Sequence, residues 1–142
     1  MTTIAYKSGI VAYESYLTQD DAIIDYDCEK MVHVDDVVFF FAGNAHNEQT
    51  LIDGYFSGSP ILVPSKAECD AIIVDGTDIY LAGLEESEFW KLPLEMNHYA
   101  LGSGAMVAFG AMDAGASAKR AVEIACNRDV YSGGEVKTYR IK

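Results

Sequence analysis

Apolar and polar residues alternate with a period of two through much of the first part of the chain, which is typical of half-buried β-strands. A Ser-Gly pair separates the first two alternating runs and predicts a hairpin. A later run is apolar throughout, as expected for a strand that is covered on both faces. The runs are Thr2–Lys7, Ile10–Glu14, Ala22–Asp25, Met31–Val34 and the apolar Val37–Ala42.

Helical periodicity follows this region and returns near the C-terminus, with further strands between. Asn47 predicts the cap of a first helix, and Ser117 predicts the cap of the last one. The Gly- and Pro-containing segment Ser57–Pro64 predicts a loop. This order of elements predicts an α+β fold. The remaining predictions are strands over 71–74, 79–82, 89–92, 99–102 and 135–141, and helices over 47–55, 105–113 and 117–128.

Length and charge narrow the class of protein. The 142 residues predict one domain over 1–142, and their 50% hydrophobic content is enough for a core. The sequence shows neither a membrane-helix run nor a signal-peptide pattern, so we expect a cytoplasmic protein that does not bind membranes. With 22 acidic and 10 basic residues the net charge is −12. A nucleic-acid partner is not expected, because phosphate contacts need clustered Lys and Arg.

The cysteines and histidines do not form a metal-ligand pattern. The cysteines are too scattered for a disulfide framework, and we expect them to be reduced and mostly buried. The histidine spacing is not that of a metal site, so no metal and no cofactor is expected. The residues are Cys28, Cys69, Cys126, His33, His46 and His98.

The start of the chain offers a nucleophile. Thr2 follows Met1, and a small second residue favours removal of the initiator methionine. Removal exposes a threonine with a free α-amine, so that one residue holds both a nucleophile and a base. The reference pKa of such an amine is about 7.7–8.0, which lets it accept a proton near neutral pH. Many chains begin Met-Thr without being enzymes, so the hypothesis that Thr2 is a nucleophile needs support from other residues.

Short motifs in a fixed order extend over almost the whole chain. They are Thr2-Thr3-Ile4, Glu14-Ser15-Tyr16-Leu17-Thr18, Ala42-Gly43-Asn44-Ala45, Gly102-Ser103-Gly104 and Arg128-Asp129-Val130-Tyr131-Ser132-Gly133-Gly134. Lys30 follows Glu14 by sixteen residues. In these motifs and this spacing the chain resembles proteasome β-subunits and the related HslV-type peptidases, which are N-terminal-nucleophile (Ntn) hydrolases. Each motif is weak alone, but their common order makes the resemblance strong.

The resemblance implies a threonine-type peptidase or amidohydrolase with Thr2 as nucleophile. Lys30, as an ammonium, would favour the deprotonated amine and hydroxyl of Thr2, and Glu14 would orient Lys30. Gly43 is the expected oxyanion donor, because glycine allows close approach to its N–H. The ordinary alternatives are a surface ion pair for Glu14 and Lys30, and turn or cap chemistry for the remaining polar residues. The residues implied to hold the amine and a water are Ser103, Asp129 and Ser132.

The resemblance also implies how a substrate is held. Thr18 would bind the substrate backbone by strand pairing. Cys28, Phe41 and Ala45 would line the primary specificity pocket, although Phe41 is large enough to fill it. The acid is Glu14 rather than the commoner Asp, so its longer side chain must fold back.

The fold implied by the resemblance is a four-layer αββα sandwich of two antiparallel sheets. The opening hairpin is shorter than in the family by about two residues on each arm. An even shortening keeps each side chain on its face, so Thr2 and Glu14 are still expected at one end of the sheet.

Two other functions remain open at this point. One is a catalytically silent assembly or binding subunit, in which a retained Met1 blocks the amine. The other is an acylase for a small amide, which would share the chemistry but differ in the pocket. The resemblance further implies a homo-oligomer, a peptide or unfolded-protein substrate and, as a possible partner, an ATP-dependent unfoldase or another regulatory protein.

Overall fold

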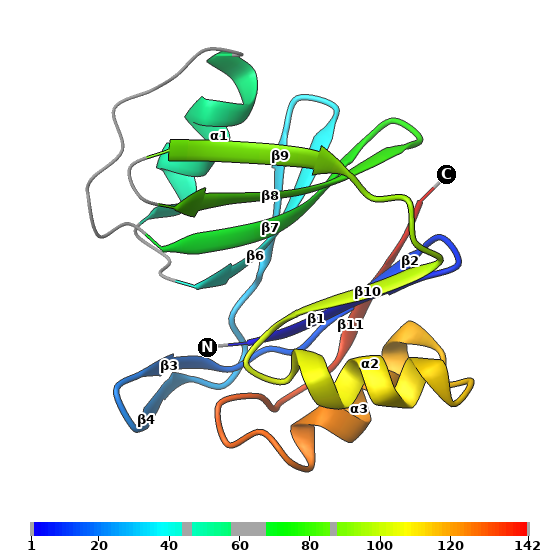
Figure 1. Cartoon of the computed structure of the whole chain (residues 1–142). Helices are drawn as coiled ribbons and strands as arrows, with labels where there is room; N and C mark the ends of the chain where they lie inside the picture. Colours follow the sequence, from blue (N-terminus) through cyan, green and yellow to red (C-terminus); the bar gives the residue numbers. More distant parts are fainter. Residues whose placement is uncertain (1, 44–46, 58–67, 86–87, 142) are drawn as a thin grey trace.

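Two antiparallel sheets face each other in the computed structural model, which describes residues 2–43, 47–57, 68–85 and 88–141 (Figure 1). The first sheet has the order β10-β1-β2-β11 and the second β5-β6-β7-β8-β9. The first comprises β1 (Thr3–Lys7), β2 (Ile10–Tyr13), β10 (His98–Gly102) and β11 (Lys137–Arg140). The second comprises β5 (Met31–Val34), β6 (Val37–Gly43), β7 (Cys69–Asp75), β8 (Asp78–Glu85) and β9 (Glu88–Pro93).

Helices cover the outer face of each sheet. α1 (Glu48–Ser57) lies against the second sheet, and α2 (Ala105–Asp113) and α3 (Ala118–Cys126) lie against the first (Figure 1). The hydroxyl of Ser117 caps α3 by accepting a hydrogen bond from the N–H of Arg120 at 3.1 Å. The αββα sandwich expected from the sequence is therefore confirmed.

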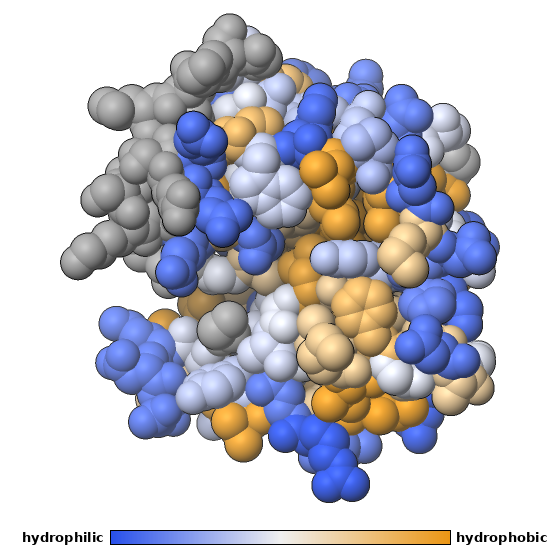
Figure 2. Space-filling view, viewed as in Figure 1, coloured by the Kyte–Doolittle hydropathy of each residue, from blue (hydrophilic) through white to orange (hydrophobic). Residues whose placement is uncertain are grey.

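Three hydrophobic clusters correspond to the three contacts between these layers. Alternation along each strand divides its residues between two faces, so that Phe40 points between the sheets and Phe39 points toward α1. The central cluster also takes Ile4 and Val11 from the first sheet. Hydrophobic side chains accordingly gather in the band between the sheets, and hydrophilic ones cover most of the surrounding surface (Figure 2). The third cluster is rich in alanine, which lets α2 and α3 pack closely on the first sheet.

The apolar run over 37–42 behaves as predicted, because β6 is paired on both sides and covered on both faces. The strand predicted over 89–92 is part of β9, which lies at the edge of the same sheet beside β8.

A short hairpin lies outside the two main sheets; the sequence predicted its second strand, Ala22–Asp25, but not its first. β3 (Leu17–Gln19) pairs with β4 (Ala22–Asp25), with a register shift between Leu17 and Thr18. The second predicted strand ends at Tyr13 rather than Glu14, so Glu14 lies at the start of the connection to this hairpin. Most of the loop predicted over Ser57–Pro64 lies outside the described residues, and Ser57 is the last residue of α1.

Candidate active site

Thr2, Glu14 and Lys30 come together at one end of the sandwich, each from the end of a different strand. Thr2 directly precedes β1, Glu14 directly follows β2, and Lys30 directly precedes β5. The antiparallel pairing of β1 with β2 accounts for the first two, because Ile4 lies opposite Tyr13 and Glu14 N–H donates to the carbonyl of Thr3 at 3.4 Å. The backbone of Lys30 is joined to β6, where its carbonyl accepts the N–H of Phe41 at 3.2 Å.

The three side chains contact one another directly. The Lys30 ammonium donates to the Thr2 hydroxyl oxygen and to Oε1 of Glu14, and the Thr2 hydroxyl donates to the same carboxylate oxygen. Thr2 is 3% exposed, Glu14 0% and Lys30 8%. A buried ion pair of this kind is weak evidence for stability, because desolvation offsets much of the attraction. The ion pair contacts the Thr2 hydroxyl, where its charges can act on the reactivity of that oxygen.

The second oxygen of Glu14 is held by backbone. Oε2 accepts the N–H of Tyr16 at 2.9 Å and the N–H of Gly133 at 3.0 Å. Burial of a carboxylate is tolerable when hydrogen-bond donors surround it. Neither Gly133 nor Tyr16 was a candidate from the sequence, although both lie within motifs that carry the resemblance. Any residue can supply a backbone N–H, so the residue types gave no signal for these two donors. Their position within the motifs was the one available signal.

Asp129 organises a second polar group beside the first. Its Oδ2 accepts the hydroxyls of Ser103 and Ser132, each at 2.5 Å. Ser103 Oγ also lies 3.4 Å from the carbonyl oxygen of Thr2, and Ser132 Oγ lies 2.8 Å from Oγ1 of Thr3. The turn after α3 and the turn before α2 therefore both reach the first residues of the chain.

The glycines of Gly102-Ser103-Gly104 allow this close approach. A Cβ on Gly102 would lie 1.9 Å from the carbonyl oxygen of Thr2, and one on Gly104 would lie 2.0 Å from Oγ1 of Thr3. A side chain at either position would displace the start of the chain from the turn. Steric contact therefore explains why both positions are glycine.

Gly43, the expected oxyanion donor, is the last residue of β6 and has a φ of 115°. L-residues rarely adopt this φ, and a Cβ here would also lie 3.0 Å from the carbonyl oxygen of Glu68. Glycine is thus required locally whatever its chemical role.

The residues expected to hold substrate are placed differently from one another. Thr18 is partly exposed in β3, and Cys28 is partly exposed two residues before Lys30. Burial raises the pKa of the Cys28 thiol, and the nearby charge of Lys30 lowers it in part. Phe41 is 3% exposed in the cluster beneath α1, where its ring stacks on Phe39 at a centroid distance of 5.6 Å. Ala45 lies outside the described residues.

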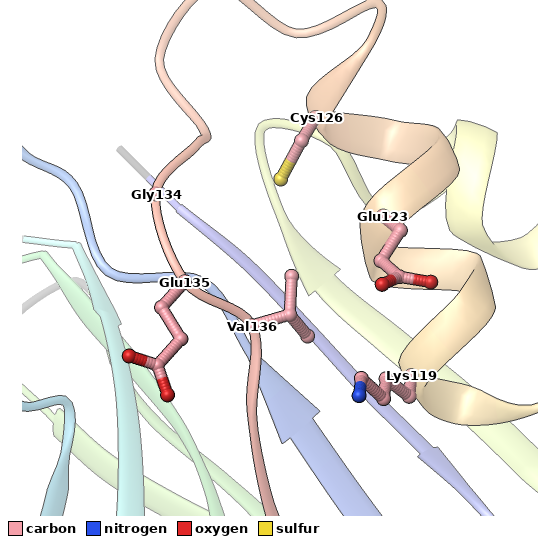
Figure 3. Close-up of a pocket in the computed structure, with 6 residues that line it drawn as sticks. All are labelled: Lys119, Glu123, Cys126, Gly134, Glu135 and Val136. Carbon is pink, nitrogen blue, oxygen red and sulfur yellow. The ribbon is translucent and has the colours of Figure 1, made fainter.

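A groove lies beside α3, apart from this cluster. It has a volume of about 450 Å³ and lies between α3 and the segment that leads to β11 (Figure 3). Burial, reinforced by the charges of Glu14 and Asp129, raises the pKa of its Cys126 thiol to about 11. The thiol is therefore protonated near neutral pH and is a poor nucleophile. Its lining residues are Lys119, Glu123, Cys126, Gly134, Glu135 and Val136.

Across the described residues no group of three or more His, Cys, Asp or Glu is arranged to hold a metal ion. His98 contacts Asp113 at 2.8 Å, His33 packs edge-on against Tyr139, and His46 lies outside the described residues. Among the described helices, none is long and apolar enough to cross a membrane.

The two facing sheets and their outer helices form an αββα fold that matches the Ntn-type fold of HslV. No protein-family model and no curated protein sequence matches the chain. Solved structures do match it over almost its whole length, and at their low sequence identity this likeness establishes the fold.

Two of these structures are of Thiobacillus denitrificans BPH. In complex with epoxomicin it has a TM-score of 0.69 and 20% identity, and on its own it has a TM-score of 0.69 and 21% identity. Both alignments cover 99% of this chain and 98% of BPH. Eukaryotic HslV from Trypanosoma brucei has a TM-score of 0.71 and 19% identity, with 97% of each chain covered.

Proposed function

We propose that this protein is a threonine-type peptidase in which Thr2, exposed by removal of Met1, is the nucleophile. One observation carries the proposal: the Thr2 hydroxyl is in direct contact with a buried lysine ammonium and a buried carboxylate. A buried ion pair serves stability poorly compared with apolar packing. Its contact with a hydroxyl at the start of the chain is what a nucleophilic site requires.

In the proposed first step, Thr2 Oγ1 attacks the carbonyl carbon of a peptide bond. The hydroxyl proton passes to the free α-amine of Thr2, directly or through one water. The positive charge of Lys30 favours both the unprotonated amine and the developing alkoxide. Glu14 keeps the ammonium beside Oγ1. Five donors already occupy its two oxygens, so Glu14 orients the lysine rather than taking the proton.

The tetrahedral intermediate places a negative charge on the former carbonyl oxygen. The N–H of Gly43 would donate to that oxygen. Collapse of the intermediate breaks the C–N bond, and the α-amine returns its proton to the leaving amine. Water then attacks the Thr2 ester with the amine as base, releasing the acid product and restoring the hydroxyl. Ser103, Asp129 and Ser132 would hold the amine and this water.

The active form is proposed to be a homo-oligomer that acts on peptides or unfolded chains, with an ATP-dependent unfoldase as the partner for folded substrates. The fold shared with HslV of Trypanosoma brucei supports this proposal. A light-scattering mass near 15.5 kDa, the mass of one chain, would contradict the oligomer.

Intact-mass spectrometry of protein from its native host tests the proposal. Epoxomicin is a suitable probe, because it is bound in the BPH structure of the same fold. We expect loss of Met1, one adduct per chain on Thr2, and loss of both adduct and peptide hydrolysis in Thr2→Ala. Retained Met1 with no adduct would refute the enzyme and favour a silent subunit. Unchanged hydrolysis by Thr2→Ala would refute the site.

A matched control keeps this test specific. Thr77 lies exposed in the turn between β7 and β8 and makes no contact with the cluster. Thr77→Ala should therefore retain both adduct formation and hydrolysis. Fluorogenic peptides and small acylamides, assayed in parallel, would separate a peptidase from an acylase.

A further inference from the structure

Gly133 lies directly against the ring of Tyr16. A Cβ built on Gly133 would lie 2.3 Å from Cε2 and 2.6 Å from Cζ of that ring, far inside van der Waals contact. Gly133 is not among the residues with a positive φ, so its backbone conformation is one that any residue adopts. The ring of Tyr16, rather than the backbone, therefore excludes a side chain at this position.

This close packing brings the turn after α3 to Glu14. Gly133 N–H donates to Oε2 of Glu14 at 3.0 Å, and the carbonyl of Gly133 accepts the N–H of Ser15 at 2.9 Å. Tyr16 N–H donates to the same carboxylate oxygen at 2.9 Å. Gly133 and Tyr16 thus hold Oε2 from two sides, which leaves Oε1 for Thr2 and Lys30.

The same turn also carries Ser132, whose hydroxyl contacts Asp129 and Thr3. Gly133 therefore connects the two polar groups of the site through one short piece of backbone. A displacement of Gly133 would rotate the Glu14 carboxylate and shift Ser132 together.

We infer that Gly133 is a positioning residue for the reaction proposed above, acting through Glu14 on Lys30 and Thr2. The inference rests on the proposed function. Adding a methyl group at Gly133 pushes the turn away from Tyr16 and withdraws its N–H from Oε2. This N–H already donates to the buried Glu14 carboxylate, so we expect the change to affect the chemical step rather than the affinity for substrate.

Gly133→Ala, Tyr16→Ala and their combination test this inference. We expect Gly133→Ala to lower kcat by about 100-fold, the usual effect of misplacing a catalytic group by about 1 Å, with KM unchanged. Removing the ring makes room for the methyl group, so the double variant should recover at least about tenfold in kcat over Gly133→Ala. The rate of epoxomicin adduct formation on Thr2 should follow kcat.

Gly110→Ala is the matched control, because a Cβ on Gly110 meets nothing within 4 Å. Its kcat should equal that of the wild type. A wild-type kcat in Gly133→Ala, or a double variant no faster than Gly133→Ala, would overturn the inference. In either case, if the wild-type protein still forms the adduct on Thr2, the proposed function stands and only the role of Gly133 is wrong. A wild-type protein that forms no adduct and hydrolyses no peptide would overturn both the proposed function and the role of Gly133.

Discussion

The hydroxyl oxygens of Thr3 and Ser132 lie 2.8 Å apart, although 129 positions separate the two residues in the chain. Ser132 is 4% exposed and also donates to Asp129, which in turn accepts the hydroxyl of Ser103. One serine therefore joins the start of the chain to the turn after α3. The contact connects the polar group around Asp129 to the residue that follows Thr2.

Ser132→Ala should lower stability and slow hydrolysis together. The variant takes the hydrogen-bond partner from the buried Thr3 hydroxyl, which costs about 1–3 kcal/mol, whereas Asp129 keeps the hydroxyl of Ser103. Urea denaturation measures the loss, and kcat on a fluorogenic peptide measures the effect on the reaction. The exposed Thr77→Ala should change stability by less than about 0.5 kcal/mol. A Ser132→Ala protein as stable as the wild type would show that this hydrogen bond is not important.

Lys30→Met should destabilise the protein, because it leaves the fully buried Glu14 carboxylate without its cation. Breaking one side of a buried ion pair costs about 3–5 kcal/mol. Adding Glu14→Gln removes the unpaired charge, and the double variant should recover much of that loss in urea denaturation. Both variants should be inactive if Lys30 activates Thr2. A double variant as unstable as Lys30→Met, or one that hydrolyses peptides normally, would contradict this account.

Cys69 should make the protein less stable at high pH. Burial, reinforced by Glu48 and Asp70, raises the pKa of its thiol from 9.0 to about 12. The folded chain keeps this proton while the unfolded chain loses it above about pH 9, so folding stability falls as pH rises from 9 to 12. The full effect is on the order of 4 kcal/mol.

Cys69→Ala removes this contribution. Urea denaturation at pH 8 and pH 10.5 should show a smaller loss of stability with pH in the variant than in the wild type. Equal losses in the two proteins would contradict the raised pKa of Cys69. The comparison is of slopes, so the cavity left by the substitution does not affect it.

Phe41→Ala should lower the stability of the protein. Phe41 is 3% exposed, and its ring stacks on Phe39 beneath α1. Truncation of a buried phenylalanine costs about 3–5 kcal/mol. Thermal unfolding and a panel of peptides that differ at the residue before the scissile bond would measure both effects. A stable variant with altered preference would show instead that Phe41 lines a specificity pocket.

Local patterns were sufficient for most elements of the fold. The alternating runs, the apolar run of β6 and the cap at Ser117 each express a preference that neighbouring residues determine. Motif order was sufficient to place Thr2, Glu14 and Lys30 together, because the β1–β2 hairpin brings the first two to one end. The strand Ala22–Asp25 was predicted, but its partner β3 was not, because three partly exposed residues carry little hydrophobic pattern.

The sequence by itself determined that Thr2, Glu14 and Lys30 are candidates and that Gly43 and Gly102-Ser103-Gly104 belong to motifs that carry the resemblance. Tertiary structure alone decided that Gly133 and Tyr16 hold one oxygen of Glu14, and that Phe41 packs beneath α1. The reason is physical. Strand and helix periodicity depends on near neighbours, whereas a backbone N–H that meets a carboxylate 119 positions away depends on how the layers pack.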